Sequence, residues 1–368
     1  MTGRELWNIA QAHSNGHLSG DGPFTKRCHH WLEQHTGAQQ ALLTHSCTAA
    51  LEMAAMLLEL VPGDEVIMPS YTFVSTANAF VLRGAVPVFV DIRPDTLNID
   101  ESLIEAAITK RTKAICVVHY AGVACEMDTI LDIAARHNLA VVEDAAQGIY
   151  SSYKDRPVGA LGDYGALSFH ETKNLISGEG GALLVRDKSN GPHAEILREK
   201  GTNRSQFFRG QVDKYSWVDI GSSYLPSELI AAFLQAQMEE GDAINTRRLA
   251  IWDRYHVWAA HHEQNGYVRR PVVPAECTHN AHMYYLLLPD LDARTEFIAR
   301  MKSNGVGTVF HYVPLHSSPA GRRYARTHGK LKMTTTLSER LVRLPLWIGV
   351  EEHIDAIFHA ADQALSGL

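Results

Sequence analysis

The chain has 368 residues, of which 45% are hydrophobic and 20% are charged, and it carries a formal net charge of -7. Its length and composition are those of a globular protein with a sizeable core, so we expect one large unit with a smaller appendage. The negative net charge disfavours non-specific binding to nucleic acid.

The sequence shows no sign of a membrane span, a secretory signal or a metal centre. No apolar stretch approaches the ~20 residues of a spanning helix, and the N-terminus lacks the charged-then-apolar order of a signal peptide. The five cysteines are scattered without a CxxC pair, and the 20 histidines lack ligand-like spacing. We therefore expect a cytoplasmic protein with reduced thiols, no metal, and neither nucleic acid nor membrane as a partner.

The first half of the chain predicts a parallel sheet covered by helices. From about residue 40 to 190, short apolar runs alternate with helix-period segments, as in α/β folds. Four runs are short enough for buried strands, at residues 66–68, 86–90, 114–118 and 139–142. Amphipathic helices are expected at residues 49–60 and 127–137.

Polar residues follow each of these predicted strands. They are residues 69–71, Asp91, His119 with Tyr120, and Glu143 with Asp144. In open α/β sheets, ligands bind at the carboxyl ends of the strands. We therefore expect these sequence-distant residues to converge on one crevice.

A long, mostly helical pattern over residues 226–262 leads to a second region of the chain. The patterns there suggest an α+β domain, with its elements at residues 283–288, 306–311 and 354–365. We place the boundary inside the long helix. The prediction is a large domain over residues 1–240 and a small C-terminal domain over residues 241–368.

Lys173 lies in a loop between two predicted buried strands. Residues 166–169 precede the loop and residues 182–185 follow it. Partial burial lowers the pKa of a lysine and makes its neutral amine available for Schiff-base chemistry. For a lone loop lysine, a solvated surface position is the commoner outcome.

Asp144 ends a predicted buried strand and is followed by small residues that permit close approach of a flat ligand. A carboxylate in that place can pair with a protonated pyridine nitrogen. The pairing keeps the ring cationic, so that a cofactor can accept the electron pair released when a Cα–H bond breaks. A helix N-cap aspartate is the alternative for this segment, because capping is common.

Hydroxyl groups open the helix that is predicted to begin near residue 46. Ser46, Cys47 and Thr48 stand where free backbone N–H groups and the helix dipole form a phosphate site. A plain N-cap is the alternative. Ser168 is a further candidate phosphate ligand, and Phe73 is a candidate to lie against a ring face or, alternatively, a core residue.

Six motifs occur in the order in which they occur in the DegT/StrS sugar aminotransferases, which the chain resembles from about Gly20 to Leu346. They lie at residues 46–48, 69–73, 118–122, 143–147, 168–174 and 178–181. The resemblance implies a fold type I transferase, whose large domain has a mostly parallel sheet in an α/β/α sandwich beside a smaller C-terminal α+β domain. It also implies a homodimer that binds pyridoxal 5'-phosphate (PLP) at the subunit interface.

The same resemblance implies roles for individual residues. Lys173 matches the Schiff-base lysine, Asp144 matches the partner of the pyridine nitrogen, and Gln147 would lie near the hydroxyl of the ring. Phe73 would stack on the ring. The residues expected around the phosphate are Ser46, Cys47, Thr48 and Ser168.

One segment departs from the pattern of the family. Many members carry Gly-x-Asn-x-Arg, whose asparagine reaches the phosphate of the neighbouring subunit, whereas residues 221–225 here read Gly-Ser-Ser-Tyr-Leu. Ser223 is the candidate to supply that contact. With residues 200–205 and 207–210, this variant resembles the branch that makes dTDP-4-amino-4,6-dideoxygalactose, as in enterobacterial common antigen synthesis.

The basic and aromatic stretch 204–217 suits a nucleotide diphosphate. Arg209 and Lys214 are candidates for its phosphates, and Tyr215 or a nearby phenylalanine is a candidate for thymine. A solvated loop is an equally common outcome for such a stretch. The other candidates to bind substrate are Lys200, His311 and Tyr312, of which His311 has a structural role as its alternative.

The predicted function is transamination of dTDP-4-keto-6-deoxy-D-glucose with L-glutamate, giving dTDP-4-amino-4,6-dideoxy-D-galactose and 2-oxoglutarate. Lys173 would carry the proton between the donor Cα and the cofactor C4'. The local motifs leave open amination at a C3 ketone instead. A sugar dehydratase on the same scaffold is a second alternative, because relatives that lose the lysine usually carry histidine and His170 lies close by. A catalytically silent binding protein is a third.

Overall fold

The computed structural model describes residues 1–366 and contains one central sheet of eight strands. Seven of these strands come from residues 40–185, and the eighth comes from residues 326–327. The strands are β1 (Gln40–Thr44), β2 (Glu65–Pro69), β3 (Val86–Val90), β4 (Thr112–Val118), β5 (Ala140–Asp144), β8 (Tyr164–Ser168), β9 (Gly181–Val185) and β12 (Arg326–Thr327). Their order is β1-β9-β8-β5-β4-β2-β3-β12. Strand β9 runs antiparallel to β1 and β8, and the pairs from β8 to β12 are parallel. The predicted mostly parallel sheet is confirmed.

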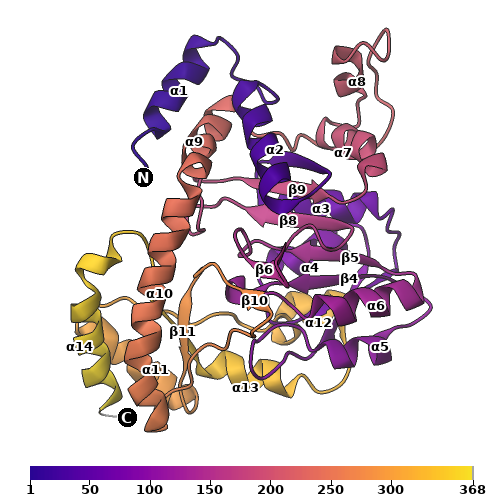
Figure 1. The fold of residues 1–368 in the computed structure, drawn as a ribbon. Helices are drawn as coiled ribbons and strands as arrows, with labels where there is room; N and C mark the ends of the chain where they lie inside the picture. Colours follow the sequence, from indigo (N-terminus) through magenta and orange to yellow (C-terminus); the bar gives the residue numbers. More distant parts are fainter. Residues whose placement is uncertain (367–368) are drawn as a thin grey trace.

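Helices cover both faces of this sheet because side chains alternate along each strand. In β4, Ile115 and Val117 join one buried cluster, whereas Ala114 and Cys116 join the cluster on the opposite face. The helices of the first face are α2 (Pro23–Thr36), α5 (Ile104–Ala107), α6 (Met127–His137) and α9 (Glu228–Glu239). Those of the second are α3 (Cys47–Leu57), α4 (Val74–Val81) and α7 (Gly191–Arg198). Figure 1 shows this layered arrangement.

A second core lies beyond a break in the long helical segment. Helix α9 ends at Glu239, and α10 (Gly241–Gln264) begins two residues later. The second core contains Trp252 and Tyr255 of α10 together with Phe297. The elements that complete it are β11 (Tyr284–Leu287), α11 (Leu291–Ser303), β13 (Leu341–Leu344) and α14 (Ile354–Leu365). Strand β12 nevertheless returns to the central sheet beside β3, and the division at residue 240 stays a prediction.

The remaining α-helices and β-strands are short or lie at the edges. They are α1 (Glu5–Ser14), β6 (Ser152–Tyr153), β7 (Arg156–Pro157), α8 (Arg204–Phe208), β10 (Cys277–Thr278), α12 (Pro319–Tyr324) and α13 (Lys332–Arg340). Within residues 1–366, no helix is long and apolar enough to cross a membrane, and no three metal-ligating side chains form a cluster. All five cysteines are free.

Two details of the expected elements are wrong. Residues 306–311 form no strand; they contribute one isolated bridge, between Val309 and Arg343, and Val309 and Phe310 are exposed. An apolar run without a neighbouring strand along its length cannot satisfy its backbone as a sheet. Helix α3 is not amphipathic but buried on most sides, because it packs against the sheet, α4 and α7.

Glu143 forms a buried pair with His119 at the carboxyl ends of β5 and β4. His119 Nε2 lies 2.8 Å from Glu143 Oε2, and both side chains are fully buried. Burial raises the pKa of Glu143, but the bonds to His119 and to backbone N–H groups outweigh it and hold the pKa below its usual value. The carboxylate accepts from Gly159 N at 2.7 Å and Gly162 N at 2.6 Å. Glu143 is therefore tied into the fold.

Replacing Glu143 with glutamine is expected to destabilise the protein by about 3 kcal/mol at pH 7, because it removes one partner of a buried pair. A group with a depressed folded pKa stabilises above its unfolded pKa and loses this contribution as pH falls through the folded pKa. The difference between wild type and Glu143→Gln should therefore shrink below about pH 4. Urea unfolding of both proteins at several pH values measures this difference in the free energy of unfolding. Exposed Glu276→Gln is the control, and equal stabilities at pH 7 would contradict the assignment.

Candidate active site

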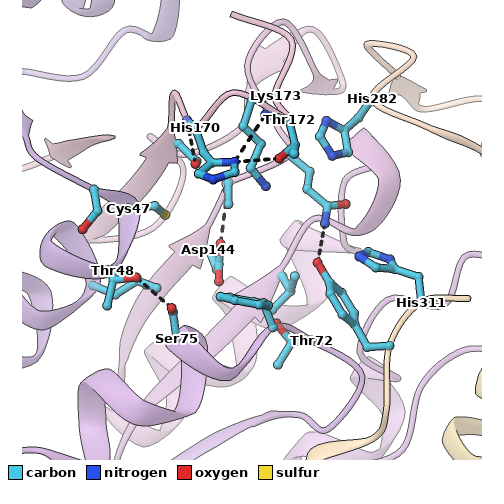
Figure 2. Close-up of a pocket in the computed structure, with 18 of the residues that line it drawn as sticks. Cys47, Thr48, Thr72, Ser75, Asp144, His170, Thr172, Lys173, His282 and His311 are labelled. Carbon is cyan, nitrogen blue, oxygen red and sulfur yellow. Dashed lines mark hydrogen bonds between the residues drawn. The ribbon is translucent and has the colours of Figure 1, made fainter. Parts of the chain in front are cut away.

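A cavity of about 520 Å³ opens where the parallel strands end. Val118, Asp144 and Ser168, the last residues of β4, β5 and β8, line it together with the starts of α3 and α4. His311 and Arg343 close it from the C-terminal part of the chain. Its volume is in the range of sites for cofactors and small ligands. Figure 2 shows the side chains that point into it.

Lys173 reaches the cavity from the loop between β8 and β9. The loop is pinned by backbone bonds from Lys173 N to His170 O at 2.9 Å and from Glu171 N to Gly178 O at 2.8 Å. Burial lowers the pKa of the Lys173 amine, while the Asp144 carboxylate acts to raise it. A lowered pKa increases the neutral fraction of the amine, which is the form that acts as nucleophile and base.

Asp144 is held as a fixed carboxylate on the floor of the cavity. Its Oδ2 accepts a hydrogen bond from Thr76 Oγ1 at 2.6 Å, and its Oδ1 accepts one from Ala146 N at 3.1 Å. Thr76 Oγ1 in turn lies 2.7 Å from Thr72 Oγ1. Figure 2 shows Asp144 and Lys173 pointing into the same space. A buried carboxylate placed in this way favours a cationic partner.

Removing the Thr76 hydroxyl tests this support. Thr76→Val is expected to lower turnover about 3- to 10-fold, because one hydrogen bond that positions the carboxylate is lost. Steady-state turnover with saturating cofactor measures the effect. Thr295→Val, at an exposed position of α11, is the control. Turnover equal to that of wild type would show that Thr76 does not position Asp144.

Gln147 and Tyr312 join the two parts of the chain across the cavity. Gln147 Oε1 accepts from Ala121 N at 2.6 Å, and its Nε2 donates to the Tyr312 hydroxyl at 3.1 Å. The ring centroid of Phe73 lies 6.3 Å from that of Tyr312. Phe73 is 56% exposed although it is a large apolar residue. An aromatic ring that stays open at the cavity is available to cover a flat ligand.

The start of α3 forms the polar end of the cavity. Ser46 caps the helix by accepting from Ala49 N at 3.1 Å, and the N–H groups of Cys47 and Thr48 have no acceptor among residues 1–366. Thr48 Oγ1 lies 2.7 Å from Ser75 Oγ. Figure 2 shows Cys47, Thr48 and Ser75 opposite His282 and His311, with Asp144 and Lys173 between them.

Gly181 permits the close approach of β9 to this helix start. A Cβ at that position would lie 2.3 Å from the Ser46 carbonyl carbon and 2.4 Å from Cys47 N. Ser168 Oγ, at the neighbouring strand end, accepts from His170 N at 3.4 Å. Free N–H groups, hydroxyls and a helix N-terminus are together a site for a phosphate. The residues present therefore fit a phosphorylated, flat, cationic cofactor.

Five residues predicted from sequence do not reach this cavity within their own chain. They are Ser223, Lys200, Arg209, Lys214 and Tyr215. They follow α7 in the stretch that includes α8, which projects from the body of the molecule in Figure 1. Arg209 is occupied by Glu195, with Nη2 2.7 Å from Oε2. A role for these residues requires a second subunit and stays a prediction.

The expected convergence of all four strand ends is wrong in part. Only the β5 residue Asp144 brings a charged group from these ends into the cavity, among the residues that the structure describes. Asp91 instead accepts from Met333 N and Thr334 N at the start of α13. His119 points to Glu143 in the core. Adjacent strand residues face opposite sides of a sheet, so one side chain of each neighbouring pair turns away.

Four further residues of the site were not predicted. They are Ser75, Thr76, His282 and Arg343. Ser75 and Thr76 follow the predicted Phe73 within one helical turn, so extending that motif by one turn would have included them. His282 is buried, with Nδ1 2.9 Å from Asn174 Oδ1. Arg343 has a weak signal, a charge inside the apolar run Leu341–Leu344.

Comparison with known proteins identifies the protein family of this chain. A model of the DegT/DnrJ/EryC1/StrS aminotransferase family matches residues 1–361. The chain belongs to this family. The spore coat polysaccharide biosynthesis protein SpsC of Bacillus subtilis is 33% identical over 372 residues, covering 99% of this chain and 95% of the relative.

Solved structures of this family share the fold. The aminotransferase TlmJ of Streptoalloteichus hindustanus is 29% identical, with a TM-score of 0.90 over 99% of this chain and 96% of TlmJ. Spr1654 of Streptococcus pneumoniae, in its PLP form, is 25% identical, with a TM-score of 0.92 over 100% of this chain and 97% of Spr1654. These structures confirm the predicted fold class, and PLP is the cofactor of the family.

Proposed function

We propose that this aminotransferase moves the amino group of L-glutamate to C4 of dTDP-4-keto-6-deoxy-D-glucose, yielding dTDP-4-amino-4,6-dideoxy-D-galactose and 2-oxoglutarate. The observation that carries the proposal is the meeting of Lys173, Asp144 and Gln147 in one cavity of a sugar-aminotransferase chain. The choice of sugar rests on residues 200–210 and 221–225, which resemble the branch that makes this product. The polysaccharide biosynthesis named for SpsC supports the same product class.

The residues of the cavity would each hold one part of PLP. Cys47, Thr48 and Ser168 would hold the phosphate, with Ser46 fixing the helix start, and Asp144 would pair with the ring nitrogen. Phe73 would cover a ring face, and Gln147 would lie near the ring hydroxyl. When bound, PLP supplies a cationic ring that accepts the electron pair left by a broken Cα–H bond.

Lys173 is the residue that moves the proton. Its lowered pKa leaves neutral amine to take a proton from the donor Cα, and the resulting ammonium returns it at C4'. The buried histidines are poor competitors for this role. Burial first, and then the nearby cations Arg343 and Lys173, lower the pKa of His311 to about 2, so its imidazole is too weak a base to compete with Lys173 for the proton.

The presence of Lys173 in the cavity argues against the dehydratase alternative. His170 also lines the cavity, but its Nδ1 lies 3.0 Å from Thr172 Oγ1 at an exposed position. A residue held at the rim in this way does not take the place of the lysine. Transamination therefore has the stronger support.

We propose that the protein acts as a homodimer whose sites contain residues of both subunits. In such a dimer, the cavity of the partner subunit would be within reach of four residues that do not line the cavity of their own subunit. They are Ser223, Arg209, Lys214 and Tyr215. Mixing Lys173→Ala with Lys214→Ala protein, each nearly inactive, should restore up to about one quarter of the wild-type activity through mixed dimers with one intact site. No restoration, or a monomer by light scattering, would contradict shared sites.

One incubation tests the substrate. PLP-loaded protein is mixed with L-glutamate and either dTDP-4-keto-6-deoxyglucose or the 3-keto isomer, and NMR determines the position and configuration of the new amine. The expected product carries an axial amine at C4, the galacto configuration. An amine at C3, or an equatorial amine at C4, would refute the substrate and leave transamination intact.

A further inference from the structure

Arg343 is a second cation that lines the cavity, besides Lys173. It lies in β13 between the buried residues Val342 and Leu344, and its backbone N donates to Val309 O at 2.8 Å. Alternation along the strand turns its side chain away from the core that those neighbours enter and toward the cavity, which it lines with Lys173 and Tyr312.

The guanidinium of Arg343 has no partner within the chain. Across residues 1–366 no hydrogen bond or ion pair involves its side chain, and its Nε is buried without an acceptor. Nearby Arg248, by contrast, donates to Ala281 O at 3.2 Å and His282 O at 2.7 Å. A guanidinium stays charged at any physiological pH, so a buried N–H without an acceptor leaves a charge uncompensated.

The two carboxylates that line the cavity already have partners. The Asp144 carboxylate accepts from Thr76 and Ala146, and Glu179 lies 3.7 Å from His170 in the exposed loop. The neighbours of Arg343 are neutral imidazoles, since burial and nearby cations lower the pKa values of His282 and His311. Lys173 is expected to engage the cofactor, which leaves Arg343 as a cavity cation without a partner among residues 1–366, so the anion that compensates it has to come from a ligand.

We propose that Arg343 binds a carboxylate of the amino donor. This inference rests on the proposed function. The expected phosphate site is at the start of α3, and Figure 2 shows His282 and His311 on the opposite side of the cavity from Cys47 and Thr48. Arg343 lines the cavity with these two histidines, and it adds to the lowering of their pKa values that burial causes first. An amino acid that reacts beside Lys173 carries a carboxylate on the reacting carbon, and a guanidinium binds carboxylates with two parallel hydrogen bonds. Arg343 is thus a donor-binding residue that fixes the amine toward Lys173.

The test separates donor binding from sugar chemistry. Titration calorimetry with 2-oxoglutarate measures dicarboxylate binding, and the absorbance change of the bound cofactor measures its reaction with L-glutamate. Arg343→Gln should weaken 2-oxoglutarate binding and raise the L-glutamate concentration for half-maximal rate, each about 10- to 100-fold. Arg343→Lys should recover part of the loss, because it keeps the charge without the planar fork. The reaction of the amino form of the cofactor with keto sugar should change little.

A matched control variant and two truncated amino donors, compared with L-glutamate, complete the experiment. Arg294→Gln removes a half-buried arginine of the same part of the chain that does not line the cavity, and it should behave as wild type. L-Alanine keeps only the α-carboxylate of L-glutamate, and 4-aminobutyrate keeps only the distal carboxylate. If Arg343 binds the α-carboxylate, Arg343→Gln should slow the reaction of L-alanine and leave that of 4-aminobutyrate unchanged. The reverse pattern would assign Arg343 to the distal carboxylate.

Two outcomes would overturn the inference. One is unchanged dicarboxylate binding in a folded Arg343→Gln protein; the other is a loss confined to the keto-sugar reaction. If donor binding depends on Arg343 while no keto sugar is aminated, the substrate proposal fails and the role of Arg343 stands.

Discussion

Replacing Lys173 with alanine is expected to lower the rate of the L-glutamate reaction by at least about 10³-fold, because the proton carrier between Cα and C4' is lost. The space left by the missing Lys173 side chain should admit a small primary amine such as methylamine, which should restore part of the rate. Stopped-flow absorbance of the cofactor in the first turnover measures both effects, so that product release does not obscure the chemical step.

Lys302→Ala, an exposed lysine of α11, serves as the control and should leave the rate unchanged. The bound cofactor should remain in Lys173→Ala, held by the start of α3 and by Asp144. A Lys173→Ala protein that reacts within tenfold of wild type would show that another group carries the proton.

The second large effect is expected at Asp144. Asp144→Asn should lower turnover by about 10²- to 10³-fold, since loss of one partner of a buried charge pair costs ~3–4 kcal/mol. The amide keeps the size of the carboxylate and can still accept from Thr76, so the change acts on charge more than on packing. Turnover at saturating L-glutamate, together with the dissociation constant of PLP, measures it.

Asp292→Asn at an exposed position of α11 is the matched control. Turnover of Asp144→Asn within a factor of ten of wild type would contradict the assigned pairing with the ring nitrogen. If only PLP affinity falls while turnover of the loaded protein is kept, Asp144 would bind the cofactor without tuning it.

Much of the fold could be predicted from apolar runs, because the periodicity of each run depends only on its own residues. Residues 86–90 coincide with β3, and residues 354–365 coincide with α14, because each pattern is long enough to fix its own period. Residues 306–311 show the limit of this reasoning. Their pattern is as apolar as that of a strand, but whether a strand forms depends on a neighbour that the sequence does not supply.

The residues of the site that could be predicted from sequence are those that lie within a recognisable motif. Lys173 and Asp144 stand beside strand ends and small residues, and both line the cavity. Glu143, the neighbour of Asp144, carries the same charge in the same motif but turns into the core to meet His119. The alternation of a strand decides which carboxylate faces the ligand, and that requires knowing which face is covered.

Arg343 could not be predicted because its role depends on tertiary contacts. It lies 170 positions after Lys173 on a short strand, and its neighbours in sequence say only that a charge interrupts an apolar run. The absence of a partner, which marks it as a ligand-binding group, is a property of the folded chain. The same holds for Thr76, whose bond to Asp144 spans 68 positions.

The central claim is that Lys173 holds the cofactor. Borohydride reduction of the PLP-loaded protein, followed by proteolysis and mass spectrometry, tests it directly because reduction makes the covalent link permanent. We expect the added mass on the peptide that contains Lys173, and no added mass in Lys173→Ala. A label on a different lysine, or an unlabelled protein with bound PLP, would contradict the claim.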